Sequence, residues 1–87
     1  MPFVQMNKPD RMIATAEVRE VVLQVEVIED YPEDVRGHSC LLRGEAASGR
    51  IVHVVCSPKE DYLAIITAYL PDAAEWDETR RQRRKGT

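Results

Sequence analysis

A chain of 87 residues, 44% of them hydrophobic, is long enough for one modest core and too short for two domains. No apolar run approaches the roughly 18 residues of a membrane span, and the first residues lack the basic flank and apolar stretch of a signal peptide, so we expect a cytoplasmic protein without a membrane partner. The formal net charge of −3 is uneven: residues 78–87 hold five of the twelve basic residues and one acid, which leaves +4 on this tail and −7 on the body.

The first half of the chain predicts an arm, one helix and one strand. Residues 1–11 contain two prolines and no sustained periodicity, so we expect a flexible N-terminal arm. From Thr15, the expected N-cap, valines recur at three- and four-residue spacing, which predicts an amphipathic helix over 15–24. The next residues are rich in Val and Ile until Pro32, and they predict a short strand over 26–31.

The second half predicts a meander. A three-residue turn ending at Gly49 and a four-residue turn over 58–61 separate three expected strands. These strands are 39–45, 50–57 and 62–69. Pro71 then opens a short helical turn through Trp76. We therefore predict one α+β domain over residues 12–77, with the N-terminal helix packed on a three- to four-stranded antiparallel meander sheet.

The lengths of these turns assign the faces of the sheet. The first turn sets Cys40 opposite Cys56 and Arg43 opposite His53, and the second sets Val54 opposite Ile65. One face is almost wholly apolar and should lie under the helix. It comprises Cys40, Leu42, Gly44, Val52, Val54, Cys56, Leu63 and Ile65. The other is a mixed, partly apolar groove that comprises Leu41, Arg43, Glu45, Ile51, His53, Val55, Ala64, Ile66 and Ala68.

The cysteine and histidine content predicts neither a metal site nor a cofactor. Cys40 and Cys56 are too few for a disulfide framework, and no CxxC or clustered His/Cys spacing suggests zinc. We expect inert core thiols that face the helix, because a reducing cytoplasm disfavours a cross-strand disulfide.

The C-terminal residues allow two interpretations. A basic tail on an acidic body can touch RNA or an acidic partner, but a solvated, frayed end is commoner, and we expect it here. Trp76 and Tyr69 are expected to anchor the preceding turn on the sheet.

Four motifs carry a family resemblance. They are EVIEDYPEDVRG from Glu26, SCLL from Ser39, GRIVHVV from Gly49, and ITAYLPD from Ile66 with Trp76 after it. In this order, over roughly residues 11–81, they resemble the bacterial and archaeal family DUF4258. The resemblance implies a fold similar to RelE/barnase-like ribonuclease toxins, in which the open face of an antiparallel sheet binds RNA. Members typically begin with a His-Ala-x-x-Arg-Met helix, and the corresponding residues 6–13 have no His, which implies a truncated start or a degenerate site.

Metal-independent RNA cleavage needs an acid, a base and a cation near the phosphorane. His53, Arg43 and Glu45 supply these types on the mixed face, although they would equally form an ordinary charge ladder. Arg43 could bind phosphate through two hydrogen bonds. Arg50 and Tyr69 lie at the rim as RNA-binding residues, and Tyr69 could stack on a base. The tail would add phosphate affinity through Arg80, Arg81, Arg83 and Arg84.

Two functions therefore stay open. One is a toxin-like, RNA-cleaving domain or a degenerate member of that class, which the resemblance favours. The other is a non-catalytic module that binds a small antitoxin-like protein or itself, as a homodimer, through a sheet edge or groove. The acidic body favours the second function, because it repels a polyanion.

Overall fold

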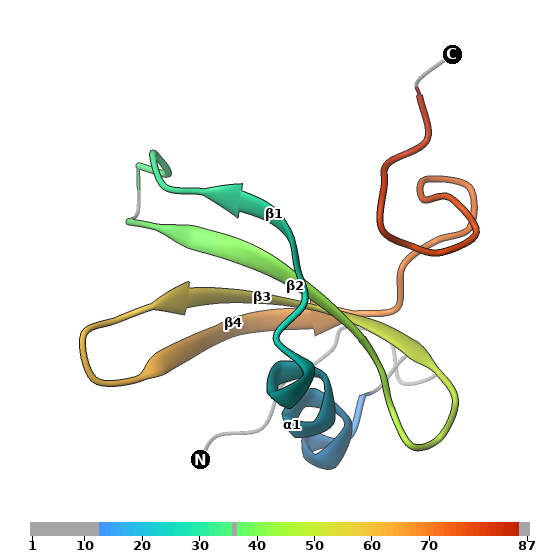
Figure 1. Ribbon diagram of the computed structural model, residues 1–87, viewed down its shortest axis with the longest axis horizontal. Coiled ribbons are helices and arrows are strands. Elements are labelled where there is room, and N and C mark those ends of the chain that lie inside the picture. The colour runs from blue at the N-terminus through green and yellow to red at the C-terminus, as the bar shows by residue number, and fades with distance from the viewer. Residues whose placement is uncertain (1–12, 36, 86–87) are drawn as a thin grey trace.

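The computed structural model describes residues 13–35 and 37–85, which form one helix followed by four strands (Figure 1). The elements are α1 (Thr15–Gln24), β1 (Val27–Tyr31), β2 (Ser39–Glu45), β3 (Ile51–Pro58) and β4 (Leu63–Tyr69). The strands make a single antiparallel sheet in the order β1-β2-β3-β4. The α+β meander is confirmed, while the N-terminal arm expected over residues 1–11 lies outside the described part of the chain.

Helix α1 is flanked by two cap residues whose backbone conformations are not helical. Its N-cap is Ala14 rather than Thr15, and the Ala14 N–H donates to the Glu17 carboxylate at 3.0 Å. Its C-cap is Val25, which adopts the left-handed conformation with φ 54° and donates its N–H to the Val22 carbonyl. Across residues 13–35 and 37–85, no helix is long and apolar enough to cross a membrane.

The core lies between α1 and one face of the sheet. The face predicted from β2 and β3 is confirmed, because Cys40, Leu42, Val52, Val54 and Cys56 are all buried together with residues of α1. Helix α1 approaches the sheet closely at Gly44, where an added Cβ would lie 2.8 Å from the Gln24 Oε1 and 3.0 Å from the Val21 Cα. A glycine at this position therefore allows the helix backbone to rest directly on β2.

The predicted pairing of β3 with β4 is wrong. Val54 lies opposite Ala68, not Ile65, because the turn falls at residues 59–62 and the register shifts between Val55 and Cys56. A one-residue shift exchanges the two faces of a strand. Ala68, expected on the mixed face, is therefore fully buried in the core, and Tyr69 pairs with His53 on the opposite side.

Residues 71–85, here termed the C-terminal strap, lie on the side of the sheet away from α1 (Figure 1). No helix is assigned where the short helical turn was expected; residues 73–75 form a single hydrogen-bonded turn, in which the Asp72 carbonyl accepts from the N–H groups of Glu75 and Trp76. Trp76 then pairs with Arg83 in an isolated antiparallel bridge. Residues 78–85 thus fold back on the protein, in contrast to the frayed end expected from their charge, although most of them stay exposed to solvent.

Gly44→Ala should lower the free energy of unfolding by about 1–3 kcal/mol, since the new methyl group would force α1 away from β2. Urea unfolding followed by circular dichroism measures this change. Glu45→Ala is the matched control, because its exposed side chain makes the expected change less than about 0.5 kcal/mol. Equal stability of the two variants would mean that α1 does not need this close contact.

Candidate functional site

His53, the predicted catalytic residue, is buried at the centre of the face opposite α1. Its side chain is 0% exposed. Nε2 lies 2.7 Å from the Arg80 carbonyl and Nδ1 lies 3.2 Å from the Tyr69 hydroxyl. The Trp76 ring packs edge-on against the imidazole, with 4.5 Å between centroids.

These contacts place a proton on Nε2 of the imidazole. A carbonyl oxygen can only accept a hydrogen bond, so Nε2 of His53 carries the proton and Nδ1 can accept from the Tyr69 hydroxyl. Burial lowers the pKa of His53 below its ordinary value, which favours this neutral form. In this conformation His53 has both nitrogens engaged and no surface at which a substrate could meet it.

Two ion pairs hold the strap against β1 and the residue before it. Arg81 pairs with Glu26, and Arg83 Nε donates to Glu29 at 2.8 Å. The hydrogen bond from Arg81 lowers the pKa of Glu26. Burial alone would raise the pKa of Glu29, but hydrogen bonds from Arg83 and Tyr31 keep it below its ordinary value.

Arg43 and Trp76 complete the closure of this face. Arg43 Nε donates to the Thr79 carbonyl at 2.8 Å, and its guanidinium lies 3.5 Å from Glu26. The Arg83 guanidinium stacks over Trp76, 4.6 Å from the ring centroid. The structure thus brings Arg43, His53 and Tyr69 together with the strap, but under it rather than on an open surface.

The other predicted site residues lie apart from this cluster or in internal contacts. Arg50 makes a two-point contact with Glu17, at 3.0 and 2.6 Å, and this pair lowers the pKa of Glu17 to about 2. Arg84 Nε donates to the Ala73 carbonyl. Glu45 stands exposed at the end of β2. Nowhere in residues 13–35 and 37–85 do three or more His, Cys, Asp or Glu side chains gather so that they could hold a metal ion.

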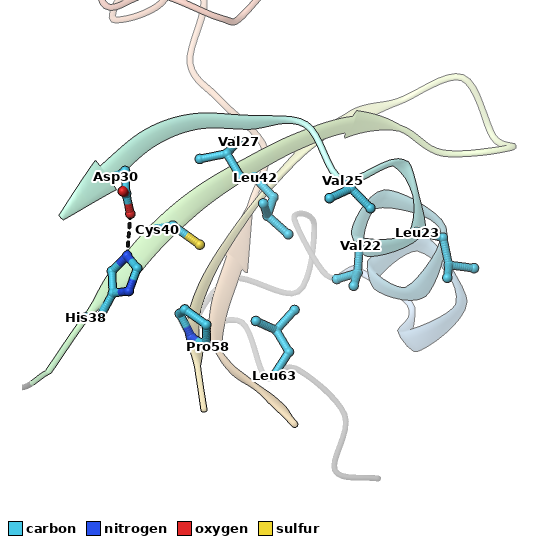
Figure 2. A pocket seen from close by; sticks show the side chains of 10 residues that line it. All are labelled: Val22, Leu23, Val25, Val27, Asp30, His38, Cys40, Leu42, Pro58 and Leu63. Atoms are coloured by element: carbon cyan, nitrogen blue, oxygen red, sulfur yellow. Dashed lines mark hydrogen bonds and ion pairs between the residues drawn. The ribbon is translucent and has the colours of Figure 1, made fainter. Parts of the chain in front are cut away.

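An open apolar groove of about 720 Å³ lies on the other side of the sheet, beside α1 (Figure 2). Its lining is Val22, Leu23, Val25, Val27, Asp30, His38, Cys40, Leu42, Pro58 and Leu63. A ten-residue helix spans about 15 Å, whereas an eight-residue strand spans about 26 Å. Helix α1 therefore covers only part of this face, and the groove occupies the remainder.

Comparison with known proteins assigns the chain to a family. The profile of the family described as Domain of unknown function (DUF4258) matches residues 4–70. The chain belongs to the DUF4258 family. Searches of curated proteins and of solved structures find no match. The DUF4258 match ends at Leu70, immediately before the strap that covers His53.

The groove was not anticipated, because the sequence placed an open groove on the opposite face of this DUF4258 domain. Leu23 and Val25 at its rim are 73% and 71% exposed. The sequence does carry a signal: the run from Val21 to Val27 has more large apolar residues than one buried helical stripe requires. Asp30 and His38, which also line the groove, are hydrogen-bonded to each other at one end (Figure 2).

Acidification should destabilise the domain through His53. Its folded pKa is lowered, so the unfolded chain binds the proton more readily, and stability present above about pH 6.5 is lost as the pH falls below it. Thermal unfolding at about pH 7.5 and 5.5 should show a lower midpoint at the acidic pH in the wild type. His53→Gln should be less stable at both values but less sensitive to pH. The same pH dependence in the variant would contradict the assignment to His53.

Proposed function

We propose that this DUF4258 domain is a non-catalytic protein-binding module whose groove takes an amphipathic segment of a partner protein. The observation that supports this most directly is the set of exposed apolar side chains around one concave surface. Leu23, Val25 and Val27 are all at least half exposed, and they surround a groove large enough for several side chains. Clustered apolar surface of this kind is typical of an interaction site.

The backbone at Val25 supports a functional role for its side chain. A β-branched residue at φ 54° is strained, and glycine or asparagine would adopt this helix-ending conformation more easily. The strained side chain is also exposed, so burial in the core does not compensate for the strain. The left-handed conformation ends α1, but it would do so equally well with glycine, so the retained exposed Val25 side chain supports a contact made outside the chain.

Charge at one end of the groove indicates the chemistry of the partner. Asp30 lines both the groove and an adjoining hollow, which Glu33 and Asp34 also line. An acidic end beside an apolar channel complements a segment in which apolar side chains are followed by Lys or Arg. A basic group there would also avoid the repulsion that the net negative charge of the chain imposes on acidic ligands.

RNA cleavage is the second proposal, and it requires the strap to leave the sheet. Arg43 in β2 and His53 in β3 do lie opposite each other, as an RNA-cleaving site would need. Against this, His53 is covered, while Arg81 and Arg83 are paired with carboxylates that a phosphate would have to displace. These contacts favour the binding module.

Val25→Gly should raise stability and weaken partner binding at the same time. Glycine relieves the left-handed strain, by about 1 kcal/mol, and removes a rim side chain of the groove. Peptides selected by the wild-type domain from a phage-displayed random library serve as the probe. They should share spaced apolar residues next to Lys or Arg, and their affinity should fall about tenfold in Val25→Gly and in Leu23→Gln.

Ile66→Gln is the matched control, because Ile66 is exposed on the other face and should leave peptide affinity unchanged. Selected peptides that bind all three variants as tightly as the wild type would overturn the proposal. Sedimentation equilibrium tests whether the groove binds a second copy of the chain. A wild-type dimer that dissociates in Leu23→Gln would mean that it does, instead of binding a partner protein.

The 87-residue chain should not cleave single-stranded RNA in EDTA, because His53 is closed off by the strap. The measurement is gel electrophoresis of a labelled RNA after incubation with the wild type and with His53→Ala. EDTA-resistant cleavage that disappears in His53→Ala would contradict the binding-module proposal and support the RNA-cleavage proposal.

A further inference from the structure

Two cysteines face each other beneath the groove. Cys40 in β2 and Cys56 in β3 are directly opposite in the antiparallel register, and their sulfur atoms lie 3.2 Å apart. Opposite residues of such a pair have Cα atoms about 4.5–5.5 Å apart, within the range of about 4.4–6.8 Å found in disulfides. The backbone therefore already has a spacing that a disulfide accepts, and the sulfurs need to approach by about 1.2 Å.

The two thiols differ in their access to solvent. Cys40 is part of the groove lining, and Figure 2 shows its sulfur directed into the groove between β2 and the side of Pro58. Cys56 lies behind it and is 0% exposed. Burial, together with the hydrogen bond to Cys40, raises the pKa of Cys56 to about 12. A reagent that enters the groove therefore meets Cys40 first.

We propose that Cys40 and Cys56 form an oxidative modification site, at which a small, uncharged disulfide reagent entering the groove converts the two thiols into a cross-strand disulfide. The Cys40 thiolate attacks one sulfur of the reagent and forms a mixed disulfide, while the first reagent thiolate leaves and takes up a proton. The Cys56 sulfur, after losing its proton, attacks the Cys40 sulfur and releases the second reagent thiolate. The two protein thiols are oxidised by two electrons, and the reagent disulfide is reduced to two thiols.

The surroundings of the pair favour this outcome over a lasting adduct. The second thiol is already at 3.2 Å, so the closing step is intramolecular and has a high effective concentration. The groove lining around Cys40 is apolar apart from Asp30 and His38, which suits an uncharged reagent better than an anionic one. This inference does not depend on whether the groove binds a partner protein.

The test uses the reduced 87-residue chain and 4,4′-dithiodipyridine, an uncharged aromatic disulfide whose released thiopyridone absorbs light. One equivalent of reagent should release about two equivalents of thiopyridone and leave a monomer that is about 2 Da lighter than the reduced chain, with no adduct. The oxidised protein should also unfold at a higher temperature, and dithiothreitol should restore the original midpoint.

Single-cysteine variants separate the role of Cys40, which attacks the reagent, from that of Cys56, which closes the disulfide. Cys56→Ser, with its fold checked by circular dichroism, should release one thiopyridone and keep a stable mixed disulfide on Cys40. Cys40→Ser should react only after denaturant is added. A persistent adduct on the wild-type chain, disulfide-linked dimers, or thiols that react only in denaturant would each overturn the proposal, and these wild-type outcomes do not depend on the variants.

Discussion

The shift in pairing between β3 and β4 determines how both faces of the sheet are closed. It inserts one residue into β4 relative to β3, so that Ala68 faces α1 and Tyr69 faces His53. Without it, Ala68 would lie on the opposite face and the core would lose a small residue that fits against Val54. The hydroxyl that engages His53 Nδ1 would also be absent. The core, the buried histidine and the docking of the strap all depend on this local irregularity.

The two faces are closed by different kinds of interaction. On one side, valines of α1 pack on apolar residues of β2 and β3, but the helix is short and leaves the groove uncovered. On the other side, the strap adds few apolar residues, and its ion pairs are partly exposed, where each contributes about 0–1 kcal/mol. The burial of Trp76 against His53 is therefore the principal anchor of the strap, because burial of a large ring contributes more than such pairs.

This arrangement places His53 and the Cys40–Cys56 pair on opposite sides of the sheet. His53 sits under the strap, outside the reach of a ligand, whereas the Cys40 thiol lines an open groove. The residues that cover His53 come largely from beyond residue 70, where the DUF4258 match ends. The apolar groove and the dithiol thus lie on the helix side of the sheet, while a smaller pocket of about 310 Å³, lined by Val55, Ala64 and Ile66 among others, lies on the other side.

The sequence by itself determined the elements and the first hairpin. Valine spacing set the bounds of α1, and the compact turn ending at Gly49 fixed the pairing of Cys40 with Cys56 and of Arg43 with His53, because a short turn leaves one register. Tertiary structure alone decided the register of β4, since a bulge depends on packing across the sheet and has no local signal. Tertiary structure also decided that the basic tail docks on the sheet and that His53 is buried. From the sequence, Arg81 and Arg83 are predicted to be solvated cations, because their partners Glu26 and Glu29 lie more than 50 residues away and only the fold brings them together.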